Sequence, residues 1–105
     1  HIKHHELPGY QYDYIQSTSV VVDFLAGPIT FSAVYCPPRH NITSYQFNEF
    51  FATLGCRFLS GGDYNAKHPV WGSRLANSRG RQLLRTLNER NLDHLSTCKP
   101  TYWPS

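Results

Sequence analysis

Residues 57–65 of this 105-residue chain read RFLSGGDYN, an apolar run that passes through two glycines into a polar and aromatic segment. The pattern predicts a short buried strand over 57–61, because brief apolar runs bounded by turn residues are typical of interior strands. The two glycines let the backbone turn sharply and let a bulky group approach closely. We therefore expect a strand that delivers Asp63 and Asn65 into a loop.

Strands are also expected before this stretch. The segments with the alternating or β-branched pattern of a strand are residues 10–16, 19–25 and 29–36. The second and third are separated by Ala26, Gly27 and Pro28, which predicts a hairpin, and Pro37 with Pro38 ends the third.

A first helix is expected between the hairpin and the strand at 57–61. Thr43 and Gln46 have the spacing of a capping box, and Gly55 is placed to cap the C-terminus. The apolar stripe that would face the core consists of Phe47, Phe50, Phe51 and Leu54.

A second helix is expected at 78–90, after a polar loop over 64–76, and a last strand at 92–96. Its core-facing residues would be Leu83, Leu84 and Leu87. Its solvent-facing residues would be Arg79, Arg81, Arg85 and Arg90. Interleaved strands and helices place the chain in the α/β or α+β class.

The composition excludes several classes of protein. With 40% hydrophobic and 16% charged residues, the chain is neither a disordered polyelectrolyte nor a membrane span, and no membrane partner is expected. Residues 57–105 carry eight basic side chains against three acidic ones, whereas residues 1–56 carry two against four. The arginine-rich second half favours a polyanionic partner. Three widely spaced cysteines favour a reducing intracellular compartment.

Asp63 and Asn65 are candidate catalytic residues. They stand two residues apart, so in extended backbone both side chains point the same way. A carboxylate can hold a water or Mg²⁺ or take a proton from the water, and an amide can donate to a phosphate oxygen without adding negative charge. This pairing suits hydrolysis of a phosphoester. The alternative for an isolated Gly-Gly-Asp-x-Asn segment is a plain turn with Asx hydrogen bonds.

The surroundings favour the catalytic interpretation. Lys67, His68 and Trp71 follow in the same loop, and Tyr35 ends another strand, where its phenol can reach a phosphate. Trp71 is more readily interpreted as a loop anchor than as a base-stacking platform. The arginines of the second helix fit a solvated face or phosphate contacts equally well.

These residues resemble those of a known family. Strand-Tyr-x-Pro-Pro, a helix, then strand-Gly-Asp-aromatic-Asn resembles the endonuclease/exonuclease/phosphatase superfamily of metal-dependent phosphoesterases. The narrower resemblance is to the endonuclease domain of non-LTR (LINE-type, jockey-like) retrotransposons. It is carried by GGDYNAKHPVWGS at 61–73, NxRGRxL at 77–83 and PTYW at 100–103. The resemblance implies a two-sheet β-sandwich flanked by helices (DNase I-like), truncated at both ends, with 1–105 as the central portion of a single domain.

The resemblance also implies a role for each candidate. Asp63 would orient or deprotonate the attacking water and is a candidate ligand for Mg²⁺ or Mn²⁺; Asn65 would hold the scissile phosphate; Tyr35 would donate to a non-bridging phosphate oxygen. The residues expected near DNA are Lys67, His68, Trp71, Ser73 and Thr101. The implied reaction is nicking of target DNA in the nucleus, which primes a reverse transcriptase domain of the same polyprotein.

Other parts of the family's site fall outside this sequence. Its metal-binding glutamate and an asparagine would precede His1, and a further aspartate with a Ser-Asp-His segment would follow Ser105. Glu6 and Glu49 do not fit the glutamate. Because the chain also lacks methionine, we expect an internal piece that is inactive and poorly stable by itself, with exposed sheet edges.

Two other functions remain open. One is a superfamily phosphatase acting on a small-molecule or lipid phosphoester, against which the Trp-Gly-Ser extension argues. The other is a non-catalytic, nucleic-acid-binding remnant of a decayed element, because half of the catalytic set lies outside the sequence.

Overall fold

The computed structural model describes residues 3–96 and 100–104. The strands are β1 (His4–Glu6), β2 (Tyr10–Gln11), β3 (Gln16–Phe24), β4 (Gly27–Tyr35), β5 (Phe58–Asp63), β6 (Leu92–Ser96) and β7 (Pro100–Pro104). The helices are α1 (Ser44–Ala52), α2 (Ser78–Glu89) and a 3₁₀ turn, η1 (Pro69–Trp71). No helix within the described ranges has the length and apolar character needed to cross a membrane.

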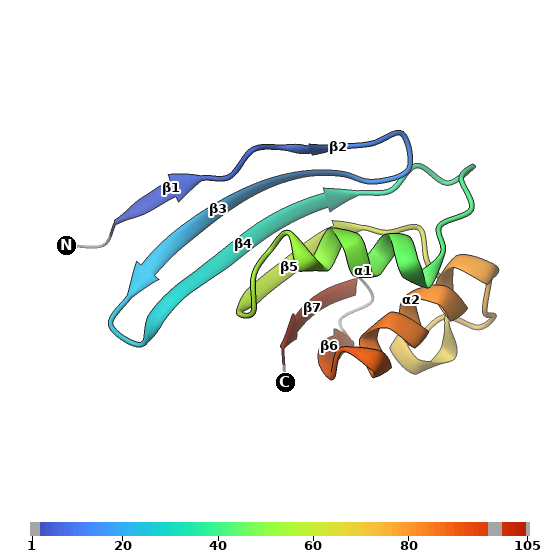
Figure 1. The fold of residues 1–105 in the computed structure, drawn as a ribbon. Helices are drawn as coiled ribbons and strands as arrows, with labels where there is room; N and C mark the ends of the chain where they lie inside the picture. The colour runs from blue at the N-terminus through green and yellow to red at the C-terminus, as the bar shows by residue number, and fades with distance from the viewer. Residues whose placement is uncertain (1–2, 97–99, 105) are drawn as a thin grey trace.

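All the described strands belong to one mixed sheet (Figure 1). Its order is β1-β3-β4-β5-β7-β6, and β2 pairs with β3 beside β1. Strands β4 and β5 are parallel and α1 forms the crossover between them, whereas the other pairs are antiparallel. The expected mixed α/β class is therefore confirmed.

The hairpin predicted around residues 26–28 is present as β3 and β4. It turns at residues 25–26, and Gly27 has a φ of 116°, a left-handed value that glycine adopts without steric cost. Arg57 stabilises the turn, because its Nη1 donates to the carbonyl of Ala26 over 2.7 Å. Both strands begin two to three residues earlier than the sequence indicates.

The strand predicted over residues 10–16 is wrong in its second half. Tyr10 and Gln11 pair as β2, the backbone then turns, with the amide of Tyr12 donating to the carbonyl of Ile15 over 3.0 Å, and Gln16 already begins β3. The alternating tyrosines pack on one another, with ring centroids 4.8 Å apart for Tyr10 and Tyr12 and 5.5 Å for Tyr12 and Tyr14. The alternation thus serves an aromatic cluster over the fully buried Ile15.

Helix α1 forms as its sequence predicts. Thr43 Oγ1 accepts from the amide of Gln46 over 3.2 Å, and Gln46 Oε1 accepts from the amide of Thr43 over 2.9 Å, which completes the capping box. The expected apolar stripe is buried in the core: Phe47, Phe50, Phe51 and Leu54. The C-cap is Thr53, and Gly55 follows with a φ of 85°, where the chain leaves the helix.

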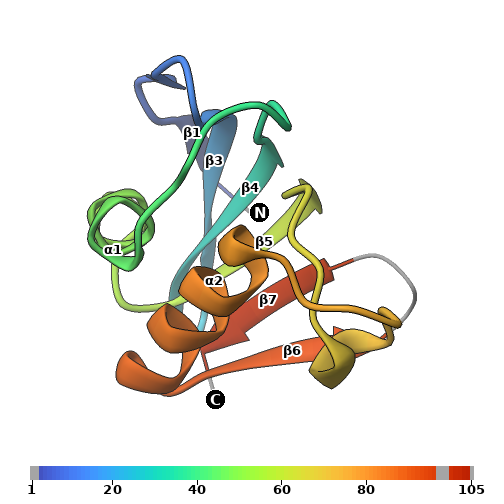
Figure 2. The ribbon, with the colours of Figure 1, turned by 90° about the vertical axis from the view of Figure 1, so that its right-hand side faces the viewer.

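The two helices cover the same face of the sheet (Figure 2). Beneath them alternate residues are buried in β4 from Thr30 to Val34 and in β5 at Phe58 and Ser60. The opposite face is apolar and partly exposed, with a shallow depression of about 360 Å³ lined in part by Val20, Phe31 and Leu59. The described chain therefore has one helix-covered face and one open face.

Candidate active site

Tyr35 and Asp63 end the two parallel strands side by side. They are partners in the register of β4 and β5, and the ladder continues one residue further, where the amide of Cys36 donates to the carbonyl of Asp63 over 2.8 Å. Because side chains alternate along a strand, both residues share the open face with Phe31 and Leu59. Both are exposed to solvent.

Gly62 lets β5 pass unusually close to β4 beside Asp63. Its φ is 143°, and a Cβ at this position would lie 2.0 Å from the carbonyl oxygen of Val34. No other residue fits without moving the backbone. The sequence predicted a sharp turn and the approach of a bulky group at the two glycines; instead β5 continues to Asp63, and the group next to Gly62 is the main chain of β4.

Asn65 lies just beyond β5 with a φ of 50°, a left-handed value that asparagine tolerates better than most residues. Its amide N–H donates to Oδ1 of Asp63 over 3.0 Å, which is an Asx turn. Its side-chain Nδ2 donates to the carbonyl of Cys36 over 2.8 Å. The turn considered as the alternative to a catalytic site is present, and it fixes the main chain at Asn65, while the Cys36 carbonyl holds the side-chain amide.

Arg79 is placed differently from its prediction. The sequence indicated a solvent-facing residue, but the side chain is only 5% exposed. Nη1 donates to the carbonyls of Cys36 and Tyr64, each over 3.2 Å. Nη2 donates to the carbonyl of Pro37 over 2.7 Å and also to that of His40. Arg81 and Arg85 are exposed as expected.

A signal for the burial of Arg79 exists in the sequence. It stands four and eight residues before Leu83 and Leu87, so the helical period puts it on the core-facing stripe. Both leucines are buried as predicted, and Leu84 is partly buried against the core. Burial lowers the pKa of Arg79, while the nearby Cys36 and Asp63 act in the opposite direction.

Asn77 joins the start of α2 to the site loop. As N-cap, its Oδ1 accepts from the amide of Gly80 over 2.7 Å and from that of Lys67 over 3.0 Å. Its Nδ2 donates to the carbonyl of Asn65 over 3.3 Å. A single amide side chain thereby caps the helix and holds both ends of the turn after Asp63.

The loop after Asn65 is anchored from within. Trp71 is buried and its Nε1 donates to the carbonyl of Ala66 over 3.1 Å, so it serves as a loop anchor, the first of its two interpretations. His68 caps η1, with Nδ1 accepting from the amide of Val70 over 3.1 Å. The amide of Ser73 donates to the carbonyl of His68 over 3.2 Å.

The remaining residues of interest are Lys67, Thr101 and Cys36. The Lys67 side chain is exposed next to the site loop. Thr101 lies in β7 opposite Gly61, and its side chain lies outside the described part of the structure. Cys36 is buried, and burial raises the pKa of its thiol to about 12, so the residue is suited to packing and not to nucleophilic attack.

Asp63 is the candidate metal ligand. No group of three or more His, Cys, Asp or Glu side chains that could hold a metal occurs among the residues described. Mg²⁺ in phosphoryl-transfer sites is held by one or two carboxylates together with waters and substrate phosphates. An exposed carboxylate with one oxygen engaged by Asn65 fits one of those positions.

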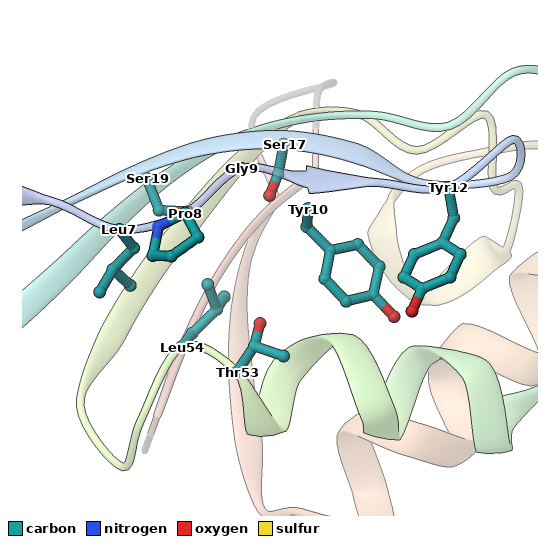
Figure 3. Close-up of a pocket in the computed structure, with 9 residues that line it drawn as sticks. All are labelled: Leu7, Pro8, Gly9, Tyr10, Tyr12, Ser17, Ser19, Thr53 and Leu54. Carbon is teal, nitrogen blue, oxygen red and sulfur yellow. The ribbon is translucent and has the colours of Figure 1, made fainter.

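Two hollows lie near this end of the sheet. A pocket of about 410 Å³ separates the Leu7–Tyr12 segment from the end of α1 (Figure 3). It contains no carboxylate and does not include Tyr35 or Asp63. A shallower depression of about 320 Å³ is lined in part by Tyr35 and Gly62 and therefore adjoins the site.

The chain is similar to known proteins. Residues 29–105 match the family described as "Endonuclease-reverse transcriptase". The chain belongs to this family. It is part of an endonuclease domain of the non-LTR retrotransposon type, which confirms the resemblance read from residues 61–73.

The relatives are much longer proteins, and the chain matches one segment of each. The chain is 37% identical over 86% of its length to the probable RNA-directed DNA polymerase from transposon X-element of Drosophila melanogaster. It is 42% identical over 73% of its length to the RNA-directed DNA polymerase from mobile element jockey of Drosophila funebris. It spans only 10% and 8% of these two proteins.

A solved structure shares the fold. The endonuclease domain of TRAS1, a telomere-specific non-LTR retrotransposon, superimposes with a TM-score of 0.71 at 29% identity. The match covers 85% of this chain and 50% of that domain. The chain therefore corresponds to about half of such a domain.

Proposed function

We propose that this chain supplies part of the phosphodiesterase site of an endonuclease domain that nicks target DNA to prime reverse transcription. The observation that carries the proposal is the meeting of Tyr35, Asp63 and Asn65 at one end of the parallel pair β4 and β5. Family membership supports the same reaction class. By analogy with the RNA-directed DNA polymerases that it resembles, a reverse transcriptase would lie in the same protein and act with it in the nucleus.

The three side chains divide the work of hydrolysis. Asp63 orients the attacking water and takes its proton, as an exposed carboxylate beside the substrate can. Asn65 has two amide hydrogens, one of which is engaged by Cys36, and the other donates to the scissile phosphate. Tyr35 donates its phenolic hydrogen to a non-bridging oxygen, so charge that develops on the phosphate meets fixed donors.

A divalent cation completes the chemistry. Asp63 would supply one carboxylate oxygen to Mg²⁺ or Mn²⁺, and the bound cation would neutralise negative charge on the phosphate. The exposure and the oxygen chemistry of this carboxylate fit such a ligand.

The open face of the sheet fits the two-sheet sandwich expected for the domain. Val20, Phe31 and Leu59 form an apolar surface opposite the helices, and a second sheet would bury it. Tyr35 and Asp63 leave the sheet on this face, so the completed site would lie where the two sheets meet.

The test uses the extended domain, by which we mean this chain continued in frame on both sides by its genomic flanks. We expect it to nick supercoiled plasmid DNA with Mg²⁺, to stop when the metal is chelated, and to lose at least about 10²-fold in rate in Asp63→Asn. Asp23→Asn is the matched control, since Asp23 is an exposed carboxylate at the far end of β3.

Three results would contradict the proposal. Undiminished nicking by Asp63→Asn would remove this residue from the catalytic machinery. Hydrolysis of inositol phosphates in place of DNA would favour the phosphatase alternative. Salt-sensitive DNA binding without any cleavage would favour the non-catalytic remnant.

A further inference from the structure

The first turn of α2 holds the two loops that follow Tyr35 and Asp63, and the second of these loops contains Asn65. One loop follows β4 and contains Cys36, directly after Tyr35; the other follows β5 and contains Tyr64, between Asp63 and Asn65. The guanidinium of Arg79 donates to main-chain carbonyls in both loops. The two loops therefore share one buried clamp.

The acceptors are all carbonyl oxygens, so the cation of Arg79 is balanced by backbone dipoles. Within the described ranges, the salt-bridge geometry is met only by Arg85 with Glu89, on the exposed side of the same helix. A planar group with five N–H donors can serve several carbonyls at once, whereas the ammonium of lysine has three donors on a flexible stem. The pattern of contacts thus requires arginine specifically.

The clamp reaches Asn65 through a shared atom. The carbonyl oxygen of Cys36 accepts from Nη1 of Arg79 over 3.2 Å and from Nδ2 of Asn65 over 2.8 Å. Since a carbonyl only accepts, its position decides which way the Asn65 amide faces. The orientation of Asn65, which we propose to bind the phosphate, therefore depends on where Arg79 holds the carbonyl of Cys36.

Two neighbours of Arg79 reinforce the arrangement. Nδ2 of Asn77 donates to the carbonyl of Asn65 over 3.3 Å. Gly80 lets the helix lie against the loop, because a Cβ there would stand 1.8 Å from the carbonyl oxygen of Lys67. The Asn-x-Arg-Gly run at 77–80, noticed in the sequence only as part of a resemblance, acts as one unit.

We propose that Arg79 is a positioning residue that, through the Cys36 carbonyl, fixes the Asn65 side-chain amide and the loops after Tyr35 and Asp63 in the geometry needed for phosphodiester cleavage. This inference rests on the proposed function. It assigns no contact between Arg79 and DNA, because the side chain is buried beneath the loops. The catalytic rate should therefore depend on Arg79 while the affinity for DNA should not.

The experiment compares Arg79→Lys with Arg81→Lys in the extended domain. Both variants keep the positive charge. Only Arg79→Lys removes buried guanidinium N–H donors, because Arg81 is exposed on the same helix. For Arg79→Lys we expect kcat for plasmid nicking to fall about 10- to 100-fold with little change in KM. Arg81→Lys should leave kcat unchanged.

A second variant separates positioning from folding. Asn77→Asp keeps an N-cap acceptor for the amides of Gly80 and Lys67 but has no hydrogen to donate to the carbonyl of Asn65. We expect a reduced kcat at saturating DNA with helix content close to that of the wild type. This variant keeps the inference testable if Arg79→Lys does not fold.

The NMR signals of the Asn65 side-chain amide give a readout that needs no activity. In the wild type, the hydrogen donated to Cys36 should exchange slowly with solvent, and in Arg79→Lys this protection should be lost. An active wild type together with an unchanged kcat and unchanged Asn65 signals in Arg79→Lys would overturn the inference. A wild type without nicking activity would instead overturn the proposed function, and the Asn65 signals alone would then decide whether Arg79 fixes this side chain.

Discussion

Asn65 and Arg79 donate to the same oxygen, the main-chain carbonyl of Cys36, over 2.8 and 3.2 Å. One residue belongs to the loop after β5 and the other to α2, so this atom joins three segments that are distant in sequence. The site is consequently built from packing between α2 and two strand ends, and its stability should respond to changes at the helix surface.

Gly80→Ala should destabilise the extended domain, although alanine normally favours a helix. Propensity alone would add about 1 kcal/mol of stability. Here the new methyl would stand 1.8 Å from the carbonyl oxygen of Lys67, and overpacking of this kind costs about 1–3 kcal/mol or more. We expect a lower free energy of unfolding in urea. Asn88→Ala, exposed on the same helix, should instead raise it slightly, and a stabilised Gly80→Ala would contradict the close contact.

Tyr35→Phe should reduce nicking without affecting the fold. The side chain is 45% exposed, so removal of its hydroxyl disturbs no packing. A hydrogen bond to a charged phosphate is worth about 1.5–3 kcal/mol, which corresponds to about a 10- to 100-fold loss in kcat/KM. Plasmid nicking and thermal unfolding measure the two effects. Tyr45→Phe, at the exposed start of α1, is the control, and equal activity in both variants would remove Tyr35 from the site.

Lys67→Ala should weaken DNA binding at every sequence and lower its dependence on salt. The ammonium is exposed next to the site loop, whereas the contacts of this residue with Asn77 use only its main chain. Loss of one phosphate contact lowers the slope of log K against log salt by about 1. Fluorescence anisotropy of a labelled duplex across a salt series measures it. Lys3→Ala, just before β1 and beside the far end of β3, should leave the slope unchanged, and an equal effect of both would indicate only overall charge.

Local patterns in the sequence predicted the parts of the fold that local interactions determine. The capping box of Thr43 and Gln46, the hairpin around Gly27 and the turn containing Asp63 and Asn65 each depend on neighbours within a few residues. The metal-ligand and DNA-contact roles remain predictions, because they depend on groups beyond this chain.

The sequence missed the turn within residues 10–16 and the burial of Arg79 for different reasons. At residues 10–16, tyrosines that alternate with polar residues fit a strand, but they fit equally well a turn in which the tyrosine rings pack together. The turn is the outcome here, and it buries Ile15 completely. The charge of Arg79 indicated solvent, but carbonyls far away in sequence compensate its burial. Helical periodicity from Leu83 and Leu87 outweighed charge at that position.

The Cys36 thiol should make the stability of the extended domain depend on alkaline pH. Burial raises its pKa to about 12 from an ordinary value of 9.0. Above pH 9 the unfolded chain releases this proton while the folded chain keeps it, so the stabilising contribution is fully present below pH 9 and is lost as the pH rises towards 12. Urea unfolding at several pH values between about 8 and about 10.5 measures the slope.

Variants at two cysteines separate this effect from general alkaline unfolding. Cys36→Ala should flatten the loss of stability above pH 9, although burial also raises the pKa of Tyr64, so part of the slope remains. Cys56→Ala is the matched control, because that thiol is exposed. Alkylation followed by peptide mapping gives an independent readout, in which Cys56 reacts in the folded protein and Cys36 reacts only after unfolding. Rapid labelling of Cys36 in the folded domain would show that the loop held by Arg79 opens, and would count against the clamp as well as the pH effect.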